Sequence, residues 1–193
     1  TMLIPMMDTK LGTNGTNHPR AKMIFVPQCE AFGKLQEEME REGGGINDIW
    51  KTNNAMFMVM MFVRMRHTWV DQCRLLLEND ELIERLKAEK FDVGYNELMD
   101  SCGGGIFHLI GIKNVAITFS MSLFEGGFEI TGAPHIPSYV PGMAAKWGDQ
   151  MTFIEKFYNV FAIVMNKFMV QLFVNPYTEL FREKFDPNFP SLW

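Results

Sequence analysis

The chain has 193 residues, of which 47% are hydrophobic, and a formal net charge of −5 at pH 7. This length and apolar content are typical of one domain with a buried core and exclude an intrinsically disordered chain. The acidic charge balance also argues against nucleic acid as a partner.

Short strands are expected to alternate with helices between Ala21 and Ser120. The opening residues Thr1 to Met6 have the composition of a buried strand. Apolar runs predict further strands, and charged or helix-periodic stretches between them predict helices. The predicted strands are 22–27, 91–96 and 114–119, and the predicted helices are 34–42, 48–77, one after Asn79 and 104–110. This order predicts an α/β fold with a parallel sheet.

The region from Ser122 to Gly142, rich in Pro and Gly, is expected to be irregular, and Met151 to Phe173 is the clearest helix. The helix has a wide apolar face and a narrow polar stripe. Its composition favours a face packed on the core, and the alternative is a face that lies on a membrane surface. Asn175-Pro176 is expected to end it, before a short helix from Glu179 to Phe185.

Two acids, Glu97 and Asp100, follow the strand predicted at 91–96. The carboxyl ends of strands are where open α/β sheets bind ligands, and a carboxylate there can do acid–base work or orient a histidine. The structural alternative is that Asp100 or Ser101 caps the next helix while Glu97 is solvated. The run Gly103-Gly104-Gly105 matches no phosphate-binding motif and is expected to serve packing and turns.

No metal site is expected. Cys29, Cys73 and Cys102 are too scattered for a CxxC site, and the histidines lack an HExxH spacing. The four histidines are His18, His67, His108 and His135.

Asn14-Gly15-Thr16 forms an N-glycosylation acceptor triplet in a polar loop. Such triplets are modified on exposed loops of secretory proteins. Asn14 is therefore the expected glycosylation site if the chain enters the secretory pathway.

The segment His135-Ile-Pro-Ser-Tyr-Val-Pro-Gly142 is followed by Gly148-Asp-Gln-Met-Thr-Phe-Ile-Glu-Lys-Phe-Tyr-Asn159. Together they resemble the animal UDP-glucuronosyltransferases, a family of UDP-glycosyltransferases. That family carries Pro-Ser-Tyr-Val-Pro and then Asp-x-Met-Thr-Phe-x-Glu-Arg and an Asn in its N-terminal domain. Phe91-Asp-Val93 with Cys102, and Thr1 to Asp8, are similar to further stretches of that domain.

The resemblance implies a GT-B glycosyltransferase with two facing Rossmann-like halves. Residues 1–193 would be a partial N-terminal, acceptor-binding domain, without its first strand and helix and without the C-terminal domain that binds the UDP-sugar. The implied partners are a small lipophilic acceptor and the UDP-sugar co-substrate, with no further cofactor. The fragment alone is expected to be inactive.

The resemblance also implies inverting catalysis by a histidine base, which would precede Thr1, and an acid that orients it. The position that matches this acid is Glu97, where most members have Asp. For the full-length protein it implies detoxification, a glycoprotein, and a place at the lumenal face of the endoplasmic reticulum membrane. Membrane contact through Met151 to Phe173 and homo-oligomer formation belong to the same expectation.

Two other functions remain open. The same pocket could serve a non-catalytic module that binds a hydrophobic small molecule or associates with a partner. A flavodoxin-like redox domain also fits the alternating pattern, but the chain has no phosphate-binding loop to support it.

Overall fold

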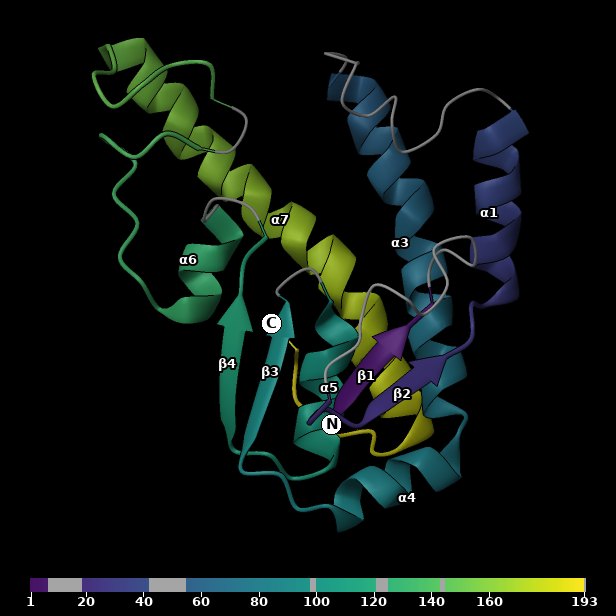
Figure 1. Ribbon diagram of the computed structural model, residues 1–193. Coiled ribbons are helices and arrows are strands. Elements are labelled where there is room, and N and C mark those ends of the chain that lie inside the picture. Colours follow the sequence, from purple (N-terminus) through teal and green to yellow (C-terminus); the bar gives the residue numbers. More distant parts are fainter. Residues whose placement is uncertain (7–18, 42–54, 98–99, 121–124, 143–144, 193) are drawn as a thin grey trace. The chain divides into compact units, whose positions relative to one another are not determined.

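The computed structural model divides the chain into two compact units, Thr1–Ile83 and Glu84–Trp193 (Figure 1). The structure describes residues 1–6, 19–41, 55–97, 100–120, 125–142 and 145–192. Each unit contains a pair of parallel strands and its own helices.

The first unit contains strands β1 (Met2–Pro5) and β2 (Met23–Val26), which pair in parallel. The helices are α1 (Glu30–Arg41), α3 (Ala55–Leu77) and the start of α4 (Asp80–Ala88). Gln72 of α3 is buried and fixes the turn between β2 and α1. Its side chain accepts a hydrogen bond from the Cys29 N–H (2.8 Å) and donates one to the Pro27 carbonyl (2.8 Å).

The second unit is built on a βαβ arrangement of β3 (Val93–Glu97), α5 (Ser101–Leu109) and β4 (Asn114–Thr118). The strands pair in parallel with Val93 opposite Asn114 and Glu97 opposite Thr118. Helix α6 (Glu125–Thr131) and the 32-residue helix α7 (Phe153–Lys184) follow (Figure 1).

The core of the second unit forms where the C-terminal half of α7 meets α5. Phe181 is fully buried and stacks on Phe189 with ring centroids 4.9 Å apart. A Cβ on Gly105 would collide with the Phe181 ring, whereas a Cβ on Gly104 would meet nothing within 4 Å. The expectation that these glycines serve packing is therefore confirmed for Gly105.

The predicted alternation of strands and helices is confirmed, with shifts of a few residues at the described ends. Residues 48–54 of the helix predicted at 48–77 lie outside the described residues. Among the described residues the strands form two separate pairs rather than one sheet. Helix α1 begins four residues before the predicted Lys34, and α6 lies in the region expected to be irregular.

The prediction that α7 ends at Asn175-Pro176 is wrong. The helix continues through Pro176 to Lys184. An interior proline costs a helix about 3 kcal/mol, because it removes one backbone N–H and clashes with the preceding turn. The residues just beyond it, Tyr177, Leu180 and Phe181, are buried, so their packing offsets this cost.

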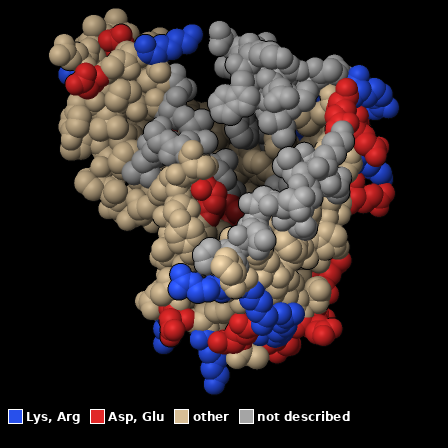
Figure 2. All heavy atoms as spheres, viewed as in Figure 1, with Lys and Arg blue, Asp and Glu red and all other residues tan. Residues whose placement is uncertain are grey.

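The expectation that the apolar face of α7 packs on the core is also wrong for the N-terminal half of the helix. Phe153, Phe157 and Phe168 are 85%, 65% and 63% exposed, while Asn159 on the opposite side is fully buried. Figure 2 shows a largely uncharged surface over this part of the helix. The apolar pattern therefore marks an outward surface, which the amino-acid pattern alone cannot distinguish from an inward one.

We expect Gly105→Ala to destabilise the chain and Gly104→Ala to stabilise it. The new methyl at position 105 forces the Phe181 ring to move, and overpacking of this kind costs about 1–3 kcal/mol. At position 104 the methyl has open space, and replacing Gly by Ala inside a helix gains about 0.5–1 kcal/mol. Urea unfolding of both variants measures the difference, and equal effects would contradict this account of the core.

Candidate functional site

Glu97 is the last residue of β3 and lies at the carboxyl edge of the strand pair. Its Oε1 accepts two long hydrogen bonds from Ser120, which follows β4: one from the backbone N–H (3.4 Å) and one from the hydroxyl (3.3 Å). Both bonds go to the same oxygen, and the side chain is half-buried. Glu97 is thus oriented by the end of the neighbouring strand and is accessible to a further donor.

Asp100 has a structural role as the N-cap of α5. Its backbone is extended (φ −103°, ψ 91°), and its Oδ1 accepts a hydrogen bond from the Cys102 N–H (3.0 Å). Burial raises the pKa of this carboxyl, although the backbone N–H groups of Cys102 and Gly103 act in the opposite direction. The alternative that Asp100 caps the helix is confirmed, which leaves Glu97 as the acid available at this edge.

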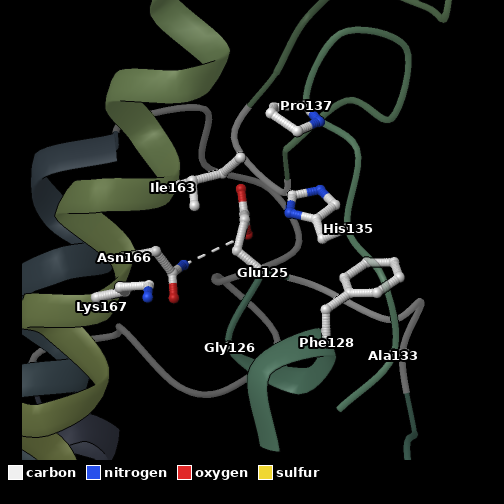
Figure 3. A pocket seen from close by; sticks show the side chains of 9 residues that line it. All are labelled: Glu125, Gly126, Phe128, Ala133, His135, Pro137, Ile163, Asn166 and Lys167. Carbon is white, nitrogen blue, oxygen red and sulfur yellow. Dashed lines mark hydrogen bonds between the residues drawn. The ribbon is translucent and has the colours of Figure 1, made fainter. Parts of the chain in front are cut away.

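A cavity of about 290 Å³ lies beside α7 in the same unit. Figure 3 shows Glu125, the first residue of α6, between α7 and the segment that carries His135 and Pro137. Nine residues line the cavity: Glu125, Gly126, Phe128, Ala133, His135, Pro137, Ile163, Asn166 and Lys167. The lining therefore combines an acid, a base and an amide with apolar and aromatic walls.

The polar group that fixes this region is Asn159 of α7, which is fully buried. Its amide donates to the carbonyls of Pro137 (2.8 Å) and Val140 (2.7 Å), and its Oδ1 accepts from the Gly142 N–H (2.7 Å). The carbonyls of this Pro-rich segment thus find their partners on a helix instead of in a sheet.

The histidines are dispersed. His67 lies on α3, His108 packs edge-to-face on Phe189, and His135 stacks on Phe128 at 4.5 Å. None of these three hydrogen-bonds to Glu97, and the described residues contain no cluster of metal-ligating side chains. His18 and the predicted glycosylation site Asn14 lie outside the described residues.

Sequence reasoning missed Glu125 and Asn166 as site residues. Glu125 falls in the stretch expected to be irregular. Asn166 belongs to the narrow polar stripe of the helix predicted at 151–173, opposite the face expected to pack on the core. The sequence contains one clue to this arrangement: the stripe includes two amides, Asn159 and Asn166. Amide side chains are buried more readily than charged ones, because they can form hydrogen bonds with backbone groups.

Two replacements of Asp100 should distinguish the effect of its capping role on stability from the effect of its charge. We expect Asp100→Ala to lower the free energy of unfolding by about 0.5–2 kcal/mol through loss of the cap. Asp100→Asn should cost little at neutral pH, because Asn caps as well as Asp and avoids burying a charge.

The same pair predicts a pH dependence. A raised pKa in the folded state means that ionised Asp100 disfavours folding, and this penalty is relieved as the pH falls through the folded-state pKa. The stability of Asp100→Asn relative to the natural chain should therefore be highest at neutral pH and should fall on acidification. Urea titrations at several pH values test this, and a relative stability that rises on acidification would contradict it.

The chain is similar to proteins of one known family. A family model described as "UDP-glucoronosyl and UDP-glucosyl transferase" matches residues 20–189. A UDP-glucuronosyltransferase 1-2 of Mus musculus is 27% identical over 180 residues, covering 90% of this chain and 33% of the relative. A 2-hydroxyacylsphingosine 1-beta-galactosyltransferase of Rattus norvegicus is 32% identical over 118 residues, covering 61% of this chain and 21% of the relative.

No solved structure matches the chain. The chain spans about a third of the length of the UDP-glucuronosyltransferases 1-2 of Mus musculus and Rattus norvegicus, to which it is similar. The family has a GT-B fold with Rossmann-like halves, and the parallel strands and helices seen here agree with it. Because the family model matches most of its residues, the chain belongs to the UDP-glucuronosyl and UDP-glucosyl transferase family.

Proposed function

We propose that this chain is the acceptor-binding part of a UDP-glycosyltransferase, close to the glucuronosyltransferases. The complete enzyme would transfer a sugar from a UDP-sugar to a hydroxyl group of a small lipophilic acceptor, with inversion at the anomeric carbon. The observation that carries the proposal is the position of Glu97: it is held by Ser120 at the carboxyl edge of β3, while the neighbouring acid Asp100 is used as a helix cap.

In this mechanism Glu97 accepts a hydrogen bond from a histidine supplied from outside residues 1–193. The other nitrogen of that imidazole takes the proton of the acceptor hydroxyl. The acceptor oxygen then bonds to the anomeric carbon, and the bond from that carbon to the UDP oxygen breaks. Glu97 stabilises the imidazolium as its charge develops, which is the role of the acid in a catalytic triad.

The donor sugar is held by the remainder of the protein in this proposal, because the chain spans only about a third of its relatives. Residues 1–193 alone would then bind acceptor and show no turnover. The sugar transferred stays open, since the relatives include a galactosyltransferase as well as glucuronosyltransferases.

The second candidate is a non-catalytic module that binds a hydrophobic small molecule. The cavity beside α7 supports it, because Glu97 is not among the residues that line this cavity. Turnover by the full-length protein separates the two candidates: a module would bind ligand without consuming UDP-sugar.

We also propose that α7 contacts a membrane. Among the described residues, α7 is the one helix long and apolar enough to cross a membrane. Its exposed side carries Phe157, Phe161 and Phe168, and lysines at positions 156 and 167 lie along one edge of this side. An exposed aromatic face bordered by lysines is typical of a helix lying in a membrane interface. A place at the lumenal face of the endoplasmic reticulum membrane, with Asn14 glycosylated, would be consistent with such contact.

In the full-length protein we expect Glu97→Gln to lower kcat by orders of magnitude with little change in acceptor binding. The amide keeps the shape of the side chain but not the charge that stabilises the imidazolium. Glu97→Asp should retain activity, because the family mostly carries Asp at this position. A silent Glu97→Gln together with an inactive Asp100→Asn would show that Asp100, not Glu97, is the orienting acid.

Replacing Phe157 and Phe161 together by Ser should abolish binding to phosphatidylcholine vesicles. Burial of each Phe contributes about 1.5–3 kcal/mol, so losing two should weaken partitioning by roughly a hundredfold or more. The matched control replaces Val93 and Tyr95, exposed apolar residues of β3, by Ser.

Vesicle flotation measures the effect. Equal binding by the two double variants would contradict the proposed contact. Loss of self-association without any vesicle binding would instead assign the α7 face to a second copy of the chain.

A further inference from the structure

We propose that Asn96 and Gly103 are positioning residues for Glu97. The Asn96 side chain ties the end of β3 to the start of α5, and the absence of a side chain at position 103 leaves the space that it occupies. The use of Glu97 as the orienting acid rests on the proposed function. The claim that these two residues fix where the Glu97 carboxylate lies rests on contacts within the second unit.

The hydrogen bonds of the Glu97 carboxylate are too weak to fix it on their own. The backbone N–H and the hydroxyl of Ser120 lie 3.4 Å and 3.3 Å from Oε1. Hydrogen bonds in proteins are typically about 2.7–3.0 Å long. The position of the carboxylate therefore depends on how firmly the backbone at the end of β3 is held.

Asn96 holds that backbone. Its Nδ2 donates to the Asp100 carbonyl at 2.6 Å, and the Asp100 N–H donates to the Glu97 carbonyl at 3.1 Å. The Asn96 carbonyl accepts a hydrogen bond from the Thr118 hydroxyl of β4 at 3.2 Å. These three bonds tie the backbone on both sides of Glu97 N–H to β4 and to the N-cap of α5.

The Asn96 amide has one favourable place and orientation. Turning it around would set its oxygen against the Asp100 carbonyl, where neither group can donate. The amide lies where a Cβ on Gly103 would be, so the two would collide. A Cβ on Gly104, the next residue of α5, would meet nothing within 4 Å. Position 103 therefore needs glycine because of Asn96, whereas position 104 does not.

Asn96 acts on Glu97 through the backbone. Successive side chains of a strand point to opposite faces. Gly94 and Asn96 share the face that packs on α5, because a Cβ on Gly94 would meet Phe107 and Asn96 meets Gly103. Glu97 follows Asn96 directly and so points to the other face. The contact with α5 thus sets the acid without blocking the side from which a histidine would approach.

NMR of the Ser120 backbone amide tests this in the 193-residue chain. An amide that donates to a carboxylate changes its chemical shift when the pH is lowered and the carboxylate is protonated. We expect this pH-dependent shift in the natural chain. Its loss in Glu97→Gln would assign it to Glu97 and not to the nearby Asp100.

The two positioning residues should control this signal. Asn96→Ala and Gly103→Ala should both abolish most of the pH-dependent shift of the Ser120 amide, because the Glu97 carboxylate is no longer held beside it. The matched control is Gly104→Ala, the same replacement one residue further along α5, which should keep the shift.

Kinetics of the full-length protein test the consequence for turnover. Asn96→Ala and Gly103→Ala should lower kcat by roughly ten- to a hundredfold, since a displacement of about 1 Å can cost a factor of about a hundred. The acceptor KM should not change, and Gly104→Ala should leave kcat unchanged. In a Glu97→Gln background Asn96→Ala should have no further effect, because no charge remains to be positioned.

Several results would overturn the inference. These are a Ser120 shift that is absent from the natural chain, that survives both Asn96→Ala and Gly103→Ala, or that is lost equally in Gly104→Ala. Independent effects of Asn96→Ala and Glu97→Gln on kcat would overturn it as well. If Asn96→Ala does not fold, the two glycine variants decide. A Gly103→Ala chain that does not fold would count against it, because only the tip of one side chain has to move.

Failure of the proposed mechanism gives a different result. A silent Glu97→Gln in the full-length protein would refute the role of Glu97 in turnover, while the Ser120 signal would still show whether Asn96 and Gly103 hold it. A damaging Glu97→Gln together with an unchanged kcat in Asn96→Ala and Gly103→Ala would refute the positioning role alone.

Discussion

The second unit depends on one buried carboxamide. The side chain of Asn159 uses both N–H groups and its oxygen on a single backbone segment, from Pro137 to Gly142. A proline-rich segment cannot join a sheet as a central strand, so its carbonyls need partners elsewhere. Removing the amide would take this partner from the buried Gly142 N–H and from the partly buried carbonyls of Pro137 and Val140. A buried backbone group left unsatisfied costs about 1–3 kcal/mol.

This constraint explains the orientation of α7. Because Asn159 and Asn166 face the protein, the phenylalanines on the other side of the helix face outward. The capping box at Thr152 and Glu155 fixes where the helix begins, about two turns before this contact. The same placement brings Pro137 and Ile163 to the cavity and Gly142 against Glu125, where a Cβ at position 142 would force the Glu125 carboxylate to shift. The cavity and the exposed apolar face of α7 therefore both follow from the hydrogen bonds of Asn159.

The sequence predicted the features that depend on local pattern. Strand and helix alternation, the cap at Asp100 and the packing role of Gly105 follow from hydrophobic period, side-chain chemistry and glycine content. The features that it missed depend on tertiary contacts. Pro176 signals a helix end, yet the burial of Phe181 overrides it. Whether the apolar face of α7 points inward or outward depends on the hydrogen bonds of Asn159, and the hydrophobic periodicity of the sequence does not reveal them. For the candidate site, placement after a strand predicted Glu97 and Asp100 alike, and the family resemblance selected Glu97. Glu125 and Asn166 meet only in the folded chain.

Hydrogen exchange at the Gly142 backbone amide tests the anchoring role of Asn159 most directly. This N–H donates to Asn159 Oδ1 at 2.7 Å in a buried setting, although it belongs to no helix or strand. If Asn159 anchors this segment, the Gly142 amide exchanges about as slowly as the amides of the α7 core, with a protection that reflects global unfolding. Exchange at Gly142 as fast as at the exposed Lys146 would contradict it.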